Sequence, residues 1–473
     1  MAWPAVVAVG AVLLGVVRVP APAGAAAPPL PVPTTPVLSL RRAPAFVVEA
    51  VADRRLATAL QRIVDQPGGP PGQTCLSVSD PDGTTAFTSN ATSPLIPAST
   101  MKLETATAAL ARLGPASHLT TQVKAAAPPA GGTVAGDLYL VGGGDPLLAT
   151  ADFAAVAGYQ QQPRLATSVE ALADKVVAAG VRRVEGRVVG DESRYDTQRY
   201  VPTWLPTYAT EGEIGPMGAL EVNGGFTAFR PRAIPAPAPA TAAAATFTAL
   251  LRARGVTVGG EAGEGTAPAP GAAVAALDSP ALSDVVAVML QESDNLTAEL
   301  LVKELGFRFG GAGTTTAGLG VVRSTLASMG LSGTGTASVD GSGLDRSDRL
   351  TCDALQAILL RSGENGDVGK GMAVAGRNGT LAKRFTGTPA AGRVRAKTGS
   401  LQGVNALTGW ISAPDGRLLQ FALLANGLPT ESAGTGLEDR VVTALAAWPQ
   451  APPPAELSPG PPAAAAGPRA SPR

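Results

Sequence analysis

The chain has 473 residues, enough for two or three domains, and its formal net charge is +0. This balance of charge gives no electrostatic basis for binding nucleic acid. One histidine, His118, and two cysteines, Cys75 and Cys352, exclude zinc sites built from several histidines or from four cysteines, so we expect no metal and no other cofactor. Hydrolytic chemistry then has to use paired carboxylates or a serine activated by a lysine.

Both ends of the chain are biased in composition. Residues 1–27 are typical of an export signal, because Trp3 to Val17 is almost wholly apolar and small residues follow it, although no Lys or Arg precedes the apolar run. The alternative is an apolar core segment. Residues 28–44 are expected to form a Pro/Ala linker, and 449–473 a disordered Pro/Ala tail. We therefore expect an exported protein of the cell envelope or the extracellular space, where a Cys75–Cys352 disulfide is as plausible as two buried thiols.

The first motif is Ser99-Thr-Met-Lys102. Apolar residues recur at helical spacing from Leu103 to Leu113, and Gly114-Pro115 ends the run, which predicts a helix that begins at Ser99. Ser99 and Lys102 then lie on one face. The free N–H groups at the helix start favour negative charge on the serine oxygen and disfavour the ammonium form of Lys102. Taken alone, the string is far better explained by an N-capping serine and a solvated lysine.

The second motif, Ser293-Asp-Asn295, lies between two predicted helices with apolar repeats over Leu282–Leu290 and Leu296–Leu305. Asn295 is expected to cap the second helix, which leaves Ser293 and Asn295 on a short loop between them. A hydroxyl and a carboxamide placed there can relay a proton and hold a substrate amide. Taken alone, the tripeptide is better explained as helix capping.

The third motif, Lys397-Thr-Gly399, opens a strand. It precedes a predicted antiparallel hairpin formed by Val404–Ala413 and Leu418–Asn426, with Asp415-Gly416 at the turn. A glycine in an edge strand lets another backbone approach, and the free edge can pair with an extended peptide. The alternative is a surface lysine that protects a sheet edge. The three motifs occur in one order, each in the structural context that it needs, and together they favour acyl transfer through a serine ester.

Other strings extend the pattern beyond these three motifs. They are Gly136-Asp-Leu-Tyr-Leu-Val-Gly-Gly-Gly-Asp-Pro146, Gly190-Asp191 followed by Trp204, Asp340-Gly-Ser-Gly-Leu344 and Gly379-Thr-Leu381. With them the chain resembles the penicilloyl serine transferases over roughly residues 45 to 447. Within that group it is most similar to the D-alanyl-D-alanine carboxypeptidase/endopeptidases of the penicillin-binding protein 4 type.

The resemblance implies an α+β fold. A β-lactamase/transpeptidase-like domain, in which helices flank an antiparallel sheet, would comprise residues 45–122 and 233–448. An accessory domain, residues 123–232, would be inserted between the first and second motifs. The Pro/Ala-rich stretch from Pro231 to Ala245 is expected to cross the surface at the end of this insert.

The resemblance also assigns roles. Ser99 would attack the penultimate D-Ala of a peptidoglycan stem peptide, and Lys102 would accept its proton. The other residues implied in catalysis are Ser293 and Lys397, which would pass a proton to the leaving D-Ala. The residues implied in substrate binding are Asn295, Thr398, Gly399 and Ser400. The backbone N–H groups of Ser99 and Ser400 would form the oxyanion hole.

The expected partners are peptidoglycan stem peptides and, as covalent inhibitors, β-lactam antibiotics. Endopeptidase activity would use the same apparatus as carboxypeptidase activity. Two alternatives remain open: a β-lactamase or esterase on the same scaffold, and an exported wall-binding protein without catalysis. The rate of deacylation separates the first alternative from a peptidase, and the absence of turnover would mark the second.

Overall fold

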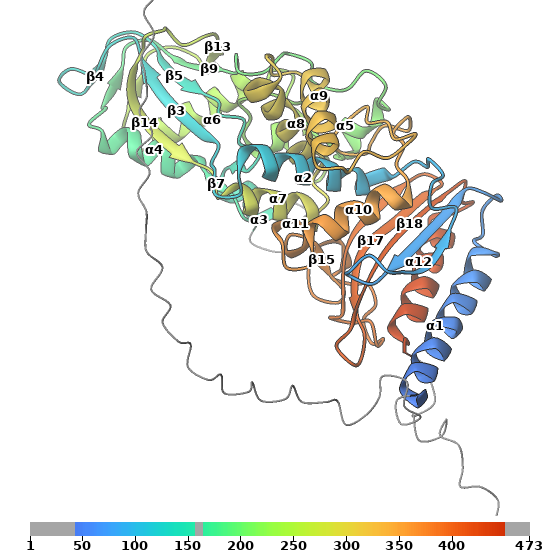
Figure 1. The fold of residues 1–473 in the computed structure, drawn as a ribbon. Coiled ribbons are helices and arrows are strands. Elements are labelled where there is room, and N and C mark those ends of the chain that lie inside the picture. Colours follow the sequence, from blue (N-terminus) through green and yellow to red (C-terminus); the bar gives the residue numbers. More distant parts are fainter. Residues whose placement is uncertain (1–42, 157–163, 450–473) are drawn as a thin grey trace, which may run out of the picture. The chain divides into compact units, whose positions relative to one another are not determined.

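The computed structural model of the protein describes residues 43–156 and 164–449 (Figure 1). The predicted export signal, nearly all of the predicted linker and the tail beyond Pro449 lie outside the described residues. The first described helix, α1 (Ala43–Val64), begins within the last positions assigned to the linker. Among the described residues, no helix is both long enough and apolar enough to cross a membrane.

The larger sheet has six strands, each antiparallel to its neighbours, in the order β15-β16-β17-β18-β1-β2. The predicted hairpin is its centre, since β17 pairs with β18 over their whole lengths. The strands are β1 (Thr74–Ser79), β2 (Thr85–Ser89), β15 (Ala373–Val374), β16 (Val394–Leu401), β17 (Val404–Ser412) and β18 (Leu418–Asn426).

Helices cover both faces of this sheet (Figure 1), which confirms the predicted α+β class. Side chains alternate along β17: Leu407 and Ile411 pack in the core shared with α1 and α12, whereas Ala406 and Trp410 pack in the core on the opposite face. The helices are α2 (Lys102–Leu113), α7 (Leu282–Gln291), α8 (Asn295–Phe309), α9 (Thr315–Ser328), α10 (Cys352–Ser362), α11 (Asp367–Lys370) and α12 (Glu431–Ala446).

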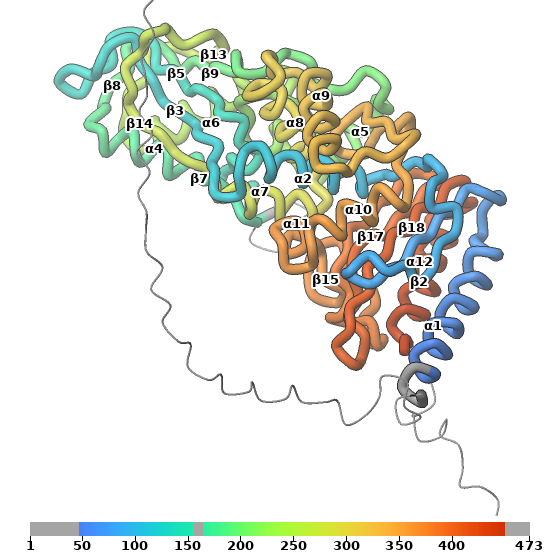
Figure 2. The backbone as a smooth tube through the Cα atoms, viewed as in Figure 1, coloured from blue at the N-terminus to red at the C-terminus, as the bar shows by residue number. Residues whose placement is uncertain are grey.

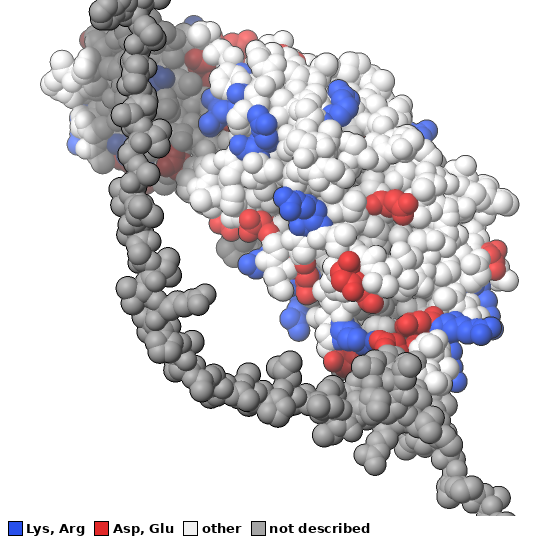
Figure 3. Space-filling view, in the orientation of Figure 1, with Lys and Arg blue, Asp and Glu red and all other residues white. Residues whose placement is uncertain are grey.

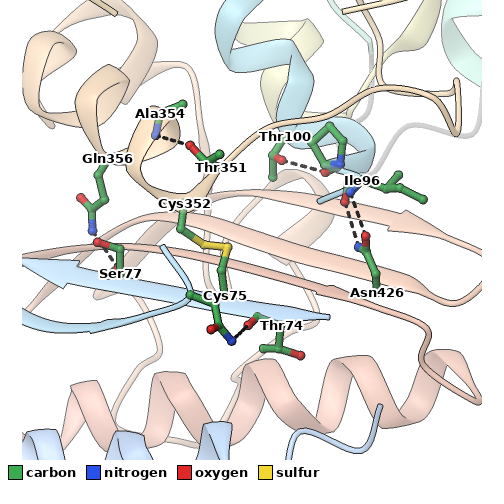
Figure 4. The surroundings of a disulfide bond; sticks show 12 residues. Thr74, Cys75, Ser77, Ile96, Thr100, Thr351, Cys352, Ala354, Gln356 and Asn426 are labelled. Atoms are coloured by element: carbon green, nitrogen blue, oxygen red, sulfur yellow. Dashed lines mark hydrogen bonds between the residues drawn. A yellow bond between two sulfur atoms is a disulfide. The ribbon is translucent and has the colours of Figure 1, made fainter. Parts of the chain in front are cut away.

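A disulfide joins this sheet to a helix. Cys75 on β1 is bonded to Cys352, the first residue of α10, so the structure contains the disulfide and not two thiols (Figure 4). One turn further along α10, Gln356 donates a hydrogen bond of 2.7 Å to the carbonyl of Ser77 on the same strand. Helix α10 is therefore attached to β1 both covalently and by hydrogen bonding.

A second sheet of five strands, in the order β13-β9-β5-β3-β14, lies in the insert. Its first and last strands in the sequence run antiparallel side by side, with Thr120 opposite Asp278 (Figure 2). The strands are β3 (Thr120–Ala125), β5 (Leu138–Val141), β9 (Val188–Asp191), β13 (Gly263–Glu264) and β14 (Ala272–Asp278). The chain thus leaves the part that holds the six-stranded sheet and returns to it at one place.

Shorter elements complete the insert. Two helices, α4 (Val169–Ala178) and α6 (Pro239–Ala253), share its main apolar core. The remaining helices are α3 (Ala151–Val156) and α5 (Thr207–Glu211). The remaining strands are β4 (Thr133–Val134), β6 (Leu148–Ala149), β7 (Thr167–Ser168), β8 (Arg183–Val184), β10 (Phe226–Ala228), β11 (Ile234–Pro235) and β12 (Thr257–Val258).

The expected surface crossing from Pro231 to Ala245 needs correction. The Pro/Ala stretch that was expected to cross the surface instead starts α6, with Pro239 at its first position and a run of alanines behind it. Proline is well tolerated at the first helical position and alanine has the highest helix propensity. Phe247 and Leu251 of α6 are buried in the core of the insert. Because β14 pairs with β3, the insert extends to Asp278.

Charged side chains of both signs are interspersed on the face shown in Figure 3, and most of that surface is uncharged. This pattern agrees with the balanced composition of the chain.

Candidate active site

The first motif occupies the start of a helix, as predicted, but its first turn is a 3₁₀ turn. The turn η1 (Ala98–Met101) carries Ser99, and α2 begins at Lys102 and ends before Gly114. Ala98 has a φ of 47°, a left-handed conformation that is rare outside glycine and frequent at functional sites. Lys102 Nζ lies 2.9 Å from Ser99 Oγ, so the predicted pair is in direct contact.

Lys102 is completely buried. Besides Ser99, its Nζ contacts Asn295 Oδ1 at 2.6 Å and the carbonyl oxygen of Ser342 at 2.7 Å. Burial lowers the pKa of Lys102 to about 8, against the opposing effect of nearby carboxylates, of which Asp340 is the largest. The sequence predicted this direction from the helix start, whereas the main physical cause in the structure is desolvation.

The second motif lies on the predicted loop between α7 and α8. Ser293 has a φ of 61°, the second left-handed residue at this site. The capping prediction was wrong by one residue: the side chain of Asp294 accepts the N–H of Thr297 at 2.7 Å and caps α8. Asn295 is therefore the first residue of α8, and its amide is free of capping. Its Nδ2 instead donates to the carbonyl of Glu213 in the insert, at 2.8 Å.

The third motif lies on β16, next to the second. Lys397 Nζ is 2.9 Å from Ser293 Oγ and 2.7 Å from the carbonyl oxygen of Thr398. This lysine is fully buried, unlike the surface lysine of the alternative interpretation. Burial, and then the charge of Lys102, lower the pKa of Lys397 well below its usual value. The two lysines and two serines of the three motifs thus form two Lys–Ser pairs.

Strand β16 offers a free edge to a ligand. Its neighbour β15 pairs only with Arg395 and Ala396, so among the described strands the segment from Lys397 to Leu401 is paired with β17 alone. The hydroxyl of Thr398 donates to that of Thr380, at 2.9 Å, and Ser400 is exposed. An unpaired strand edge of this kind can accept an extended peptide as an added strand.

Two glycines permit the close approach of three chain segments. A Cβ on Gly399 would lie 2.9 Å from the carbonyl oxygen of Pro97 and 3.1 Å from the backbone nitrogen of Ser99, so β16 runs directly past the serine. Gly343 has a φ of +84°, and a Cβ there would lie 1.9 Å from the carbonyl oxygen of Ala98. The turn η1 that carries Ser99, called the serine turn below, is therefore held between β16 and the Asp340–Leu344 loop.

The sequence interpretation gave no site role to several residues in this network. They are the Ser342 carbonyl, Glu299, Asp340, and Trp204 and Glu213 of the insert. The string Asp340-Gly-Ser-Gly-Leu344 was a sequence signal for the loop that carries Asp340 and the Ser342 carbonyl, since a loop with two glycines can pack closely against another backbone. The single histidine is used elsewhere, because His118 Nδ1 lies 2.7 Å from the carbonyl oxygen of Ser279.

A cavity of about 210 Å³ lies beside the second motif. Ser293 and Asn295 form one side of it, and the insert contributes three phenylalanines in edge-to-face contact, Phe153, Phe226 and Phe229. The insert therefore forms part of the wall of this cavity beside the second motif. The arrangement holds the Ser99 hydroxyl beside Lys102, a lysine that loses its proton readily. The second pair, Lys397 and Ser293, belongs to the same site.

The sequence of the chain is similar to those of known proteins. The model of the D-Ala-D-Ala carboxypeptidase 3 (S13) family matches residues 55–238 and 228–448. The chain is 31% identical to a D-alanyl-D-alanine carboxypeptidase of Actinomadura sp., over 78% of this chain and 80% of that protein. It is 33% identical to carboxypeptidase DacB of Mycolicibacterium smegmatis, over 85% of this chain and 86% of that protein.

The fold is similar to the crystal structure of penicillin binding protein 4 (dacB) from Haemophilus influenzae. The TM-score is 0.69 at 20% sequence identity, and the similarity covers 82% of this chain and 98% of that one. The Haemophilus protein has also been solved in complex with a β-lactam.

Proposed function

Since the chain belongs to the D-Ala-D-Ala carboxypeptidase 3 (S13) family, we propose that it is a serine-type D-Ala-D-Ala carboxypeptidase acting on peptidoglycan stem peptides. The observation that carries the proposal is the contact of 2.9 Å between Lys102 Nζ and Ser99 Oγ inside a buried network. A lysine with a pKa of about 8 can take the proton of a serine hydroxyl, which the permanently charged guanidinium of an arginine cannot do.

The reaction follows from this geometry. Ser99 Oγ attacks the carbonyl carbon of the penultimate D-Ala while its proton moves to Lys102 Nζ. The negative charge that develops on the carbonyl oxygen is stabilised by the backbone N–H groups of Ser99 and Ser400. The C–N bond then breaks, and the leaving D-Ala amine receives, through Ser293, the proton that Lys102 took from Ser99. The acyl group remains as an ester on Ser99, and the Lys102 amine is neutral again. Water hydrolyses this ester and regenerates the serine.

The remaining polar groups hold the substrate. Lys397 and Thr398 bind the terminal carboxylate, and an anion placed there favours the charged form of Lys397. Asn295 Nδ2 has two hydrogens, of which the contact with Glu213 uses one, so the other is available to a substrate carbonyl. The free edge of β16 supports binding of the stem peptide as an extended strand.

Two further features belong to the same proposal. The apparatus also serves an endopeptidase, because a D-Ala amide that bears a longer substituent presents the same scissile bond. The protein acts outside the cytoplasmic membrane. The disulfide between Cys75 and Cys352 supports this location, because disulfides persist in oxidising compartments.

The test is the intact mass of the protein after brief exposure to benzylpenicillin, followed over hours. A β-lactam that acylates Ser99 keeps its leaving nitrogen attached through the opened ring, so the ester is expected to persist. We expect one adduct per protein molecule, and no adduct on the Ser99→Ala variant. Release of D-alanine from a pentapeptide by the wild-type protein, absent in the variant, completes the test.

Other results would contradict the proposal. An adduct that clears rapidly while benzylpenicillin is consumed would assign the site to a β-lactamase. Saturable binding of peptidoglycan that survives Ser99→Ala, without any adduct or turnover, would assign the protein to the non-catalytic alternative.

The pH dependence of acylation provides an independent prediction. Below the Lys102 pKa of about 8 the ammonium form dominates and has no lone pair to accept the serine proton. The second-order rate constant for acylation by benzylpenicillin should therefore rise about tenfold per pH unit up to this pKa and level off above it. Stopped-flow measurements from pH 6 to pH 9 check this, and a flat profile over that range would contradict the assignment of Lys102 as the base.

A further inference from the structure

The Lys102 amine has three oxygen partners, and only one of them reacts. Its Nζ contacts Asn295 Oδ1 at 2.6 Å, the Ser342 carbonyl at 2.7 Å and Ser99 Oγ at 2.9 Å. An ammonium group donates three hydrogen bonds, but a neutral amine donates two and keeps one lone pair. When the first two acceptors hold the two N–H bonds of the neutral amine, the lone pair faces Ser99. The position of the Ser342 carbonyl therefore decides where the lone pair points.

Glu299 holds the segment that carries this carbonyl. Its Oε1 accepts the backbone N–H of Gly341 at 2.9 Å and that of Ser342 at 2.8 Å, and the side chain is fully buried. Glu299 lies four residues after Asn295 on α8, on the same face of the helix. One helix thus fixes both of the unreactive partners of Lys102, one directly and one through the loop.

Trp204 of the insert is hydrogen-bonded to the same loop. Its indole N–H donates to Asp340 Oδ2 at 2.8 Å. The other oxygen of this buried carboxylate accepts the N–H of Gly343 at 2.6 Å and that of Ser342 at 3.1 Å. The loop around the Ser342 carbonyl is thereby hydrogen-bonded to a helix of the catalytic part and, through Asp340, to the insert.

We propose that Glu299 is a positioning residue that orients the Lys102 amine toward Ser99 through the Ser342 carbonyl, with Trp204 as a second support through Asp340. The inference rests on the proposed function, because it concerns the base of that reaction. Neither residue touches the reacting atoms. Their effect is on the geometry of proton transfer, which is sensitive to displacements of about 1 Å.

Glu299→Ala and Glu299→Gln form a matched pair that tests the proposal. Among the described residues, Glu299 Oε2 has no hydrogen-bond partner, so glutamine can keep both bonds of Oε1 to the loop and place its NH₂ group at the other position. Burial raises the pKa of Glu299 to about 8, so glutamine also resembles the protonated side chain present at pH 7. Alanine removes both bonds.

Acylation by benzylpenicillin at pH 7 is the measurement. We expect Glu299→Ala to acylate on the order of 10- to 100-fold more slowly than the wild-type protein, and Glu299→Gln to restore a rate close to wild type. Misfolding alone would lower the fraction of protein that can be acylated, without changing the rate of the remainder. The amplitude and the rate constant of the reaction are therefore recorded separately.

The pH profile supplies a second readout. The ionisable groups that act on Lys102 are Asp340, Glu299, Asp294, Glu213 and Lys397. Loss of a fixed acceptor destabilises the ammonium form, so Glu299→Ala should move the rise in rate to lower pH while lowering its plateau. If Lys102 loses its proton more readily in Glu299→Ala and Ser99 is nevertheless acylated more slowly, the amine has lost its orientation toward Ser99.

Trp204→Phe tests the second support, with Tyr208→Phe as its control. Both substitutions keep an aromatic ring in the same apolar cluster, but only the first removes a donor to Asp340, since the Tyr208 hydroxyl faces the Leu344 carbonyl at 3.5 Å. Trp204→Phe should acylate more slowly than Tyr208→Phe. Equal rates for these two variants would remove Trp204 from the proposal.

The outcomes separate the two proposals. If the wild-type protein is acylated and Glu299→Ala is acylated at the same rate, only the inference about Glu299 fails. If Glu299→Gln is as slow as Glu299→Ala, the hydrogen bonds of the side chain to the loop are not what supports the reaction, which also overturns the inference. If the wild-type protein is not acylated at all, the proposed function fails and the inference fails with it.

Discussion

The Lys102→Arg variant is expected to acylate Ser99 about 10⁴-fold more slowly than the wild-type protein, a loss of about 5.5 kcal/mol of transition-state stabilisation. The guanidinium group stays protonated at any pH that the protein survives, so it has no lone pair for the serine proton. The site also has no room for it, because Lys102 is fully buried and its three acceptors surround one nitrogen atom. The measurement is the rate of acylation by benzylpenicillin together with the release of D-alanine.

Lys303→Arg is the matched control. Lys303 is also fully buried, and it pairs with Asp196 and the carbonyl of Gln198 in the insert, away from the serine. The same chemical change at this position should leave the rate constant for acylation near that of the wild-type protein. An active Lys102→Arg variant would show that Lys102 is not the general base.

Gly343→Ala is expected to lower the rate of acylation about 100-fold and the free energy of unfolding by about 4 kcal/mol. The backbone of Gly343 has a φ of +84°, which alanine adopts only with strain, and the new Cβ would lie 1.9 Å from the carbonyl oxygen of Ala98. Relief of this clash has to move either the Ala98–Ser99 turn or the loop that carries the Ser342 carbonyl. Thermal unfolding and the rate of acylation measure the two effects.

Gly416→Ala separates backbone strain from the clash. Gly416 has a φ of +85°, almost the same as Gly343, but a Cβ there would meet no atom within 4 Å. This variant should lose only about 1 kcal/mol of stability and keep its rate of acylation. If Gly343→Ala behaves in the same way, close packing of the loop against the serine turn does not contribute to the reaction.

The elements that the sequence predicted well are those with local signals. The helical spacing from Leu103 to Leu113 and the turn at Asp415-Gly416 each determine a local conformation, and the structure contains both. The contact between Ser99 and Lys102 follows from helical geometry alone. Short-range patterns of this kind are sufficient to place the serine, its neighbouring lysine and the edge strand.

The remainder of the site depends on partners that are distant in the sequence. The bond from Trp204 to Asp340 joins residues 136 positions apart, and no local pattern encodes it. Asp294 could have been recognised as the cap of α8, since Asp is as good an N-cap as Asn. The two candidates, Asp294 and Asn295, are adjacent in the sequence, so the prediction was displaced by one position. The Pro/Ala stretch was wrongly predicted to cross the surface, because it looks like a linker by composition. Its alanines form a helix because Phe247 and Leu251 further along pack in a core.

Because β3 pairs with β14, the chain enters and leaves the insert at neighbouring points. Its two ends meet at Thr120 and Asp278, whose side chains are joined by a hydrogen bond of 2.6 Å, so a different module could replace it without rethreading the large sheet. Its chemistry is less separable, because Trp204 and Glu213 reach from it to Asp340 and Asn295. A chimaera with a different insert that lacks these two contacts should fold but acylate slowly. Exchange of the insert is therefore compatible with activity only where the new insert also supports the surroundings of Lys102.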